Sequence, residues 1–225
     1  MKAKSVWFFE DVNLYNLLCP HKLKSYSKEH AFNYYKKKEF IYSENHDAKD
    51  IFIITEGKVK IGYFNANGDE IVTTILKRGE LFGESAIFGE SHRKEFAQSI
   101  DNKTSICSVT INQVQKLMKS NQAFSFKIYK FIGFKIKKTE RHLKLLLHKD
   151  AKTRLLEFLK DLNVEYGMYC KKNSCNIISH PYTQKDIASL LAVSRPTLNI
   201  LLNKLEKDKL IKINRNKITI NKVLM

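Results

Sequence analysis

The chain has 225 residues with 40 lysines and arginines against 23 aspartates and glutamates, so its formal net charge is +17 and a polyanion is the first partner to consider. Its apolar content of 43% excludes a mainly disordered chain, and no stretch approaches the ~18 uninterrupted apolar residues of a membrane-spanning helix. Four cysteines are too few for a disulfide scaffold, and Glu10 and Asp11 interrupt the N-terminus before a signal sequence can form, so we predict a cytoplasmic protein without membrane contact.

Residues 1–112 hold 16 basic and 15 acidic residues, so this segment is close to neutral. Two helical stretches are expected first, at Val12–Leu18 and Pro20–Ser27. Short runs rich in β-branched and aromatic residues then predict strands over Phe40–Tyr42, Ile51–Thr55, Lys58–Phe64, Glu70–Lys77 and Ser105–Ile111. The pair Asn67-Gly68 indicates a hairpin, because both residues tolerate positive φ. Many short strands at this spacing predict a β-sandwich or barrel.

The spacing of apolar residues changes near Gln113, and the charge changes with it. Residues 113–150 have a net charge of +8, and residues 151–225 have a further +8. A stripe with a spacing of three to four predicts a long helix over Gln122–Lys149, and Asp150 is expected to cap the next helix, Ala151–Asn163. The stripe consists of Phe124, Ile128, Phe131, Ile132, Lys135, Ile136, Thr139, Leu143, Leu146 and Leu147. It can pack on its own domain or on a second copy of the chain, and we favour a coiled-coil-like dimer because the opposite face is rich in lysine.

Residues 183–220 carry the sharpest functional pattern. Thr183 and Asp186 form a variant of the capping box at the start of a short helix, and a tight turn follows. Ser194 then caps a second helix. Opposite its leucines, this helix presents Arg195, Thr197, Asn199, Asn203 and Lys204. Two strands, at residues 210–213 and 217–220, enclose a basic tip at Arg215. Together these features predict a winged helix-turn-helix, which is a DNA-binding motif.

Four landmarks occur along the chain: Ile53–Lys60, Gly79–Glu84, the long helix that ends at Lys149-Asp150, and Val193-Ser194-Arg195 in the helix-turn-helix. In this combination the chain resembles the Crp/Fnr family of bacterial transcription regulators. The resemblance implies an α+β fold with an N-terminal, jelly-roll-like β-roll sensor domain, a long dimerisation helix with a hinge, and a C-terminal winged helix-turn-helix. We expect these parts at residues 1–112, 113–149 and 150–225. The resemblance also implies a homodimer that binds an inverted repeat in double-stranded DNA, with RNA polymerase and a small-molecule effector as further partners.

The resemblance assigns the residues that contact DNA. Arg195 takes the family's guanine-reading position, where a guanidinium can pair with O6 and N7 of the base. Pro196 and Ile200 stand where activator-type members place a glutamate and a second arginine, so the preferred half-site should differ from theirs. Further contacts, mainly to phosphates, are expected from Gln184, Ser194, Thr197, Asn199, Asn203, Lys204 and Arg215.

The effector of the sensor is less well defined. By resemblance the candidate effector residues are Gly83, Glu84, Ser85, Arg93, Lys94 and Thr139. Aligned without gaps, Lys94 and Glu95 replace the Arg-Ser pair that neutralises the phosphate in nucleotide-binding members, whereas a one-residue slip would bring Arg93 into place. Thr139 matches a position that contacts adenine, but Glu140 replaces the serine that follows it there. Because the Glu95 carboxylate would repel a phosphate in a partly buried pocket, we predict another effector, or none, in place of cyclic AMP.

Other chemistries leave weaker patterns. Cys19, Cys107, Cys170 and Cys175 lack the clustered spacing of an iron–sulfur site. Cys170, Cys175 and His180 have a zinc-like spacing, but they supply three ligands only, so we predict no metal and no resident cofactor. Because the sequence contains no Walker loop, dinucleotide fingerprint or hydrolase motif, we predict that the chain is not an enzyme. Non-specific binding of RNA or another polyanion stays open as an alternative.

Overall fold

The computed structural model describes residues 32–147, 150–170, 175–214 and 217–221. These residues divide into two compact units, and the boundary falls within helix α3, between Lys135 and Ile136. The predicted helices at Val12–Leu18 and Pro20–Ser27 lie outside the described residues.

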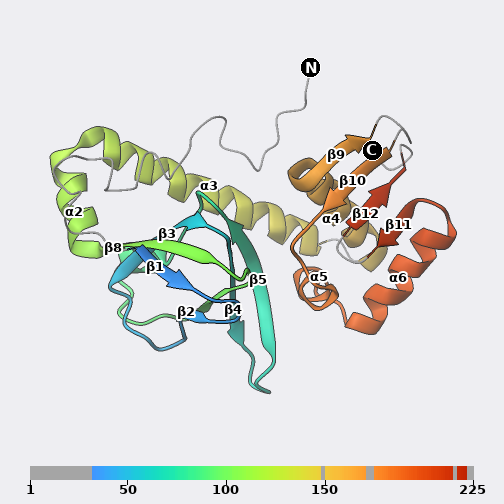
Figure 1. The fold of residues 1–225 in the computed structure, drawn as a ribbon, viewed down its shortest axis with the longest axis horizontal. Helices are drawn as coiled ribbons and strands as arrows, with labels where there is room; N and C mark the ends of the chain where they lie inside the picture. Colours follow the sequence, from blue (N-terminus) through green and yellow to red (C-terminus); the bar gives the residue numbers. More distant parts are fainter. Residues whose placement is uncertain (1–31, 148–149, 171–174, 215–216, 222–225) are drawn as a thin grey trace. The chain divides into compact units, whose positions relative to one another are not determined.

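The first unit contains two four-stranded antiparallel sheets (Figure 1). One sheet has the order β1 (Phe32–Tyr35), β8 (Thr104–Thr110), β3 (Asp50–Glu56) and β6 (Leu81–Phe82). The other has the order β2 (Phe40–Tyr42), β7 (Phe96–Ser99), β4 (Lys58–Phe64) and β5 (Glu70–Lys77). Side chains from both sheets form one buried core, which includes Ile54, Val59, Phe82, Ala97 and Ile106. The predicted β-rich sensor fold is confirmed.

Strand β3 is buried on both faces, which explains its uninterrupted apolar run. Phe52 and Ile54 belong to the core between the sheets, whereas Ile51 and Ile53 belong to a second core. Helices α2 (Ile111–Ser120) and α3 (Gln122–Leu147) cover this second core (Figure 1). The residues that α3 contributes to it are Phe124, Ile128 and Phe131. The first part of the predicted stripe therefore packs on its own domain, and its assignment to a dimer seam is wrong for these three residues.

The hairpin between β4 and β5 forms where the sequence places it, but its turn differs in detail. Gly68 has a φ of 79°, whereas Asn67 does not adopt positive φ. Asn65 shapes the turn instead, because its side-chain oxygen accepts the backbone N–H groups of Asn67 at 3.0 Å and Asp69 at 2.8 Å. One asparagine thus satisfies two backbone donors that a two-residue turn would leave to water.

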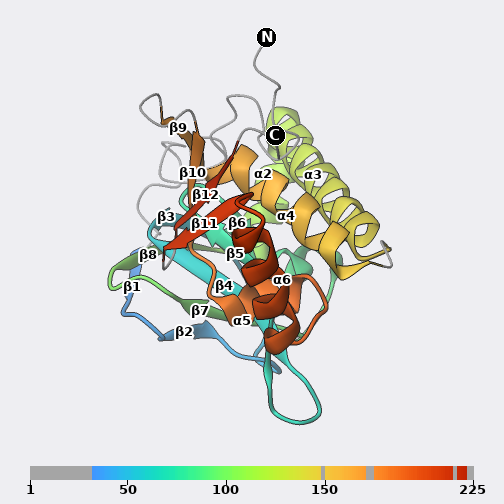
Figure 2. The ribbon, with the colours of Figure 1, turned by 90° about the vertical axis from the view of Figure 1, so that its right-hand side faces the viewer.

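The second unit combines helices with one four-stranded antiparallel sheet (Figure 2). Helix α4 (Ala151–Tyr166) begins at Asp150, whose carboxylate accepts the N–H of Thr153 at 2.7 Å, so the predicted cap is confirmed. The sheet has the order β11 (Ile211–Asn214), β12 (Lys217–Ile220), β10 (Cys175–Ser179) and β9 (Gly167–Cys170). Helices α5 (Gln184–Leu190) and α6 (Arg195–Lys207) lie between β10 and β11 in the chain. The strands that carry Cys170 and Cys175 pair with each other, and β10 also pairs with β12 of the predicted wing.

Candidate nucleic-acid interface and sensor site

Side-chain caps set where both helices of the helix-turn-helix begin. The Thr183 hydroxyl accepts the Asp186 N–H at 3.2 Å, and the Asp186 carboxylate accepts the Thr183 N–H at 2.7 Å. At the start of α6, the Ser194 hydroxyl accepts the Thr197 N–H at 3.2 Å. Pro196 stands in the first turn of α6, where a backbone donor would have no helical partner. Both predicted caps are confirmed.

The turn between the two helices is held from two sides. Ala192 adopts the left-handed conformation with a φ of 50°, and Val193 donates its backbone N–H to the Ala188 carbonyl at 3.0 Å. From α4, the Arg154 guanidinium donates to the Leu191 carbonyl at 2.9 Å. Helix α6 is therefore presented on a supported turn and not on a free loop.

Helix α6 buries one face and leaves the other in solvent. Leu198, Leu202 and Leu205 are at most 3% exposed. The predicted DNA contacts Arg195, Pro196, Thr197, Asn203 and Lys204 are exposed, and Asn199 is half-buried. The caps add the exposed Ser194, and α5 adds the exposed Gln184 at its first position. The structure therefore places all but one of the predicted DNA contacts at accessible positions of the helix-turn-helix, while Arg215 lies outside the described residues.

In the sensor unit, Arg93 is a buried structural residue. Arg93 is only 2% exposed, and one of its guanidinium nitrogens donates a hydrogen bond to the Gly83 carbonyl at 2.8 Å. A second nitrogen donates to the Asp50 carbonyl, and the guanidinium carbon lies 4.6 Å from the centre of the Tyr42 ring. Gly83 has a φ of 74°, and an added Cβ would come within 3.0 Å of Arg93. The guanidinium is thus engaged by protein groups at the cassette Gly79–Glu84, where the resemblance places an effector phosphate.

Two carboxyl groups lie beside this arginine. The Tyr42 hydroxyl donates to Glu95 at 2.9 Å, and the Lys135 ammonium of α3 donates to Glu84 at 2.6 Å. Burial raises the pKa of Glu95, and the Glu84 carboxylate raises it further, although the Tyr42 hydrogen bond opposes this shift. Burial, with the nearby Glu95 carboxylate, also raises the pKa of Tyr42. The second carboxylate oxygen of Glu84 is buried and has no hydrogen-bond partner within the described residues.

The other candidate effector residues differ in exposure and in position along the chain. Lys94 is exposed and forms an ion pair with Glu90 at 2.6 Å. Ser85 is half-buried in the short helix η2 (Glu84–Phe88). Thr139 and Glu140 are exposed on the part of α3 that belongs to the second unit. The structure brings together Gly83, Glu84 and Arg93 within the sensor unit, whereas the exposed Lys94 side chain is paired with Glu90.

Two of the cysteines, Cys170 and Cys175, lie in paired strands. Cys170 and Cys175 are directly opposite in the β9–β10 hairpin, and Cys175 is buried. Within the described residues, no cluster of three or more His, Cys, Asp or Glu side chains has the arrangement of a metal site. None of the described helices has the length and hydropathy needed to span a membrane.

Two family models match the chain over the two functional parts. The cyclic nucleotide-binding domain matches residues 32–121, and the Crp-like helix-turn-helix domain matches residues 153–223. The chain belongs to the Crp/Fnr family of transcription regulators. This regulator is 25% identical over 189 residues to the global nitrogen regulator of Nostoc sp. The aligned region covers 84% of each of the two chains.

Two further comparisons support the assignment. The CRP-like cAMP-activated global transcriptional regulator of Mycobacterium tuberculosis is 26% identical to this chain over 159 residues. This alignment covers 71% of this chain and 70% of the relative. A CooA mutant from Carboxydothermus hydrogenoformans has the same fold, with a TM-score of 0.79 at 24% identity over 97% of this chain and 96% of that chain. The relatives are regulators and not enzymes, and DNA binding through the helix-turn-helix is the activity that the family supports.

Sequence reasoning missed three groups that build the sensor site of this Crp/Fnr regulator: Tyr42, Asp50 and Lys135. Tyr42 and Asp50 surround Arg93, and Lys135 joins the long helix to Glu84. No local pattern marks them, because each becomes relevant only through a contact at least 43 positions away in the chain.

Proposed function

We propose that this Crp/Fnr chain is a homodimeric, sequence-specific regulator that binds an inverted-repeat operator in double-stranded DNA. The observation that carries the proposal is the exposed polar face of α6, which the Ser194 cap and the supported turn hold in a defined direction. Two such helices in a dimer would enter the major groove at half-sites about one DNA turn, ~34 Å, apart. Arg195 in the first turn reads guanine, and the hydroxyl and amide groups around it position the phosphates.

Helix α3 supports the dimer through a second apolar stripe. Large apolar side chains are exposed along one line of this helix at spacings of three, four or seven, which is three plus four: Phe126, Tyr129, Ile136, Leu143 and Leu147, which are 54–71% exposed. Gly133 and Glu140 fill the two remaining positions of the repeat. An apolar repeat of this kind is typical of a coiled-coil seam. The dimer therefore uses this stripe, which is rotated from Phe124, Ile128 and Phe131.

The sensor domain responds to a signal other than cyclic AMP. The guanidinium of Arg93 already serves two backbone carbonyls, and Glu84 and Glu95 place two carboxyl groups beside it. A cyclic nucleotide phosphate at this cassette would have to displace those bonds and approach negative charge. Gly83, Glu84, Ser85 and Arg93 still form the part of the β-roll where a different small-molecule effector would act.

The parts of the chain have separate roles in this proposal. Residues 1–112 sense the signal, residues 113–149 form the dimerisation helix and hinge, and residues 150–225 bind DNA. Lys135, which pairs with Glu84, gives the sensor a direct contact with the long helix. The regulator acts in the cytoplasm with RNA polymerase as its partner at the promoter.

Selection of bound sites from genomic DNA, followed by binding measurements at fixed salt, tests the proposal. A specific regulator should bind its selected inverted repeat at least ~10³-fold more tightly than random DNA. A ratio near one would instead identify a non-specific polyanion-binding protein, whose affinity depends on charge alone.

A further inference from the structure

Two cysteines of the second unit face each other across a hairpin. Cys170 is the last residue of β9 and Cys175 is the first residue of β10, and the two are direct partners in the antiparallel register. Side chains at directly opposite positions lie on the same face of a sheet, with Cβ atoms about 4.5–5.5 Å apart. Both thiols are free in the structure. The fold therefore holds two free thiols side by side, at residues that the proposed function does not use.

The spacing of the two strands suits a disulfide bond. Opposite Cα atoms of an antiparallel pair are about 4.5 or 5.5 Å apart, depending on the hydrogen-bond pattern. Both values lie within the range of about 4.4–6.8 Å that disulfides span between Cα atoms. The bond needs Cβ atoms roughly 3.5–4.5 Å apart, so the strand ends have to approach by at most about 2 Å. Because the pair stands at the end of both strands, the rest of the ladder can stay in register during this approach.

A metal site does not account for the pair. The zinc-like spacing of the sequence includes His180 as a third ligand, but His180 follows the last residue of β10, whereas Cys175 is its first. The two ends of this strand are about 13 Å apart, because a strand advances about 3.3 Å per residue. His180 and the two thiols therefore cannot bind one metal ion, and the pair is left with the chemistry of two thiols.

The two thiols differ in exposure, and this difference gives each a role. Cys170 is partly exposed, whereas Cys175 is only 4% exposed. An oxidant from solution can therefore reach the Cys170 sulfur first, and Cys175 is placed to attack the product. Redox-sensing cysteines often combine an accessible thiol with a neighbouring resolving thiol. Where disulfides occur in cytosolic proteins, they are usually transient and serve catalysis or redox sensing.

We propose that Cys170 and Cys175 form a reversible, redox-sensing disulfide, with a low-molecular-weight disulfide such as oxidised glutathione as the oxidant. The Cys170 thiolate attacks one sulfur of oxidised glutathione, and the first glutathione leaves as a thiol. The Cys175 thiolate then attacks the Cys170 sulfur, and the second glutathione leaves. In total, two electrons and two protons pass from the protein thiols to the two glutathione molecules. An excess of reduced glutathione reverses both steps.

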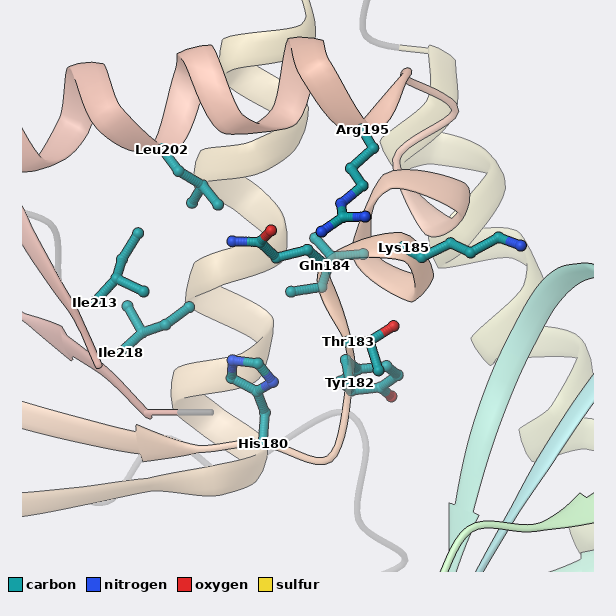
Figure 3. Close-up of a pocket in the computed structure, with 10 residues that line it drawn as sticks. His180, Tyr182, Thr183, Gln184, Lys185, Arg195, Leu202, Ile213 and Ile218 are labelled. Atoms are coloured by element: carbon teal, nitrogen blue, oxygen red, sulfur yellow. The ribbon is translucent and has the colours of Figure 1, made fainter. Parts of the chain in front are cut away.

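The thiol pair lies at the end of the sheet away from the DNA-binding residues. At the other end of β10, Ser179 pairs with Lys217, the first residue of β12. His180 follows there, and it lines one pocket together with Gln184 and Arg195 (Figure 3). Figure 3 shows the Arg195 side chain turned toward Gln184. The residues assigned to the operator thus gather at one end of β10, and the thiols stand at the opposite end.

Only one consequence of the proposal rests on the proposed function. Oxidation leaves the operator contacts in place, and it proceeds on the DNA-bound regulator as it does on the free one. The disulfide ties down the end of the edge strand β9, where Met168 and Tyr169 are exposed. The oxidised and reduced forms therefore differ at an accessible edge of the sheet and not at the DNA-binding residues.

Peptide mapping of the full-length protein tests the disulfide. The protein is incubated with oxidised glutathione, its remaining thiols are blocked with N-ethylmaleimide in denaturant, and the digest is analysed by mass spectrometry. We expect a link between Cys170 and Cys175 that reduced glutathione removes, while Cys107 is found blocked, and non-reducing electrophoresis should show a single chain. Absence of this link in oxidised glutathione, or a link between two chains in its place, overturns the proposal.

Single serine variants test the order of the two steps. Cys175→Ser should stop at the mixed disulfide and carry one glutathione on Cys170. Cys170→Ser should react at least about tenfold more slowly, because its remaining thiol is buried. Cys19→Ser keeps the pair and is the control, which should form the same disulfide as the natural protein. Equal reactivity of Cys170→Ser and Cys175→Ser would show that the assigned roles are wrong, and the peptide map of the natural protein decides the disulfide if either variant fails to fold.

Oxidation in the presence of saturating operator tests the consequence for DNA binding. The rates of disulfide formation with and without operator should agree within about twofold, and fluorescence anisotropy should give operator Kd values for the two forms within about threefold. Protection by operator of about tenfold or more would contradict the placement of the thiols away from DNA. If the chain bound no operator at all, the proposed function would fail, and the peptide map would still decide whether the disulfide forms.

Discussion

Arg195 is the residue on which sequence selectivity should depend. It is exposed at the first position of α6, and no described acidic side chain forms an ion pair with it. Arg195→Ala should remove about 1–3 kcal/mol of discrimination between operator and random DNA and abolish site-specific footprinting, while dimerisation is unchanged. Lys204→Ala is the control, because loss of a phosphate contact should weaken binding to operator and random DNA alike. An unchanged footprint for Arg195→Ala would contradict the assignment of α6 as the recognition helix.

Arg93 should matter for stability. Arg93→Met keeps much of the side-chain volume but leaves the Gly83 and Asp50 carbonyls without this donor. We expect a loss of about 2–6 kcal/mol in the free energy of unfolding, since each of the two acceptors without a partner costs ~1–3 kcal/mol. Calorimetric unfolding measures the effect, and Lys94→Met, which changes an exposed ion pair, should alter stability by less than ~1 kcal/mol. Equal stability of the two variants would mean that the Arg93 guanidinium is not structural and is available to a ligand.

Among the elements, α3 has two apolar faces with different tasks. One face carries Phe124, Ile128 and Phe131 on the β-roll, and the other leaves Phe126, Tyr129, Ile136, Leu143 and Leu147 exposed. Leu143→Glu should shift the protein from dimer to monomer, because a dimer would lose two buried leucines, each worth ~1.5–3 kcal/mol, and gain facing charges. Sedimentation velocity should report at least a hundredfold weaker association. Lys116→Glu on α2, an exposed charge change outside the stripe, should leave the dimer intact; monomerisation by both variants would argue against this seam.

How far the sequence predicted each element depends on how local its determinants are. The caps at Thr183 and Ser194 and the β4–β5 hairpin follow from residues within five positions of each other. Both caps form as expected, and the hairpin forms at the expected place, although Asn65 and not Asn67 shapes its turn. The β9–β10 hairpin was not predicted, because the sequence of β9 does not alternate between apolar and polar residues. Its adjacent apolar residues Met168 and Tyr169 are both exposed. The two faces of α3 could not be separated by period alone, since apolar residues occupy both. The buried state of Arg93 depends on the Asp50 carbonyl, 43 positions away.

Across the whole molecule, the positive charge is spread over many residues, whereas selectivity for a DNA sequence is expected from a few. All but one unit of the net charge of +17 lies in residues 113–225, whereas the sensor segment is nearly neutral. Positive charge of this kind raises affinity for any DNA and speeds the search along it, but it carries no sequence information. Selectivity is expected from a few positions around Arg195.

The last prediction concerns the signal that the whole regulator receives. Titration calorimetry of the full-length protein with cyclic AMP and cyclic GMP should show no binding up to millimolar concentration, and neither nucleotide should change operator affinity. The physical reason is that Arg93 is committed to Gly83 and Asp50 while Glu95 stands beside it. The regulator of Mycobacterium tuberculosis that is named as cAMP-activated serves as the positive control in the same buffer. Micromolar binding of either nucleotide would show that Arg93 releases its carbonyls on demand, and that the β-roll of this chain is a nucleotide sensor after all.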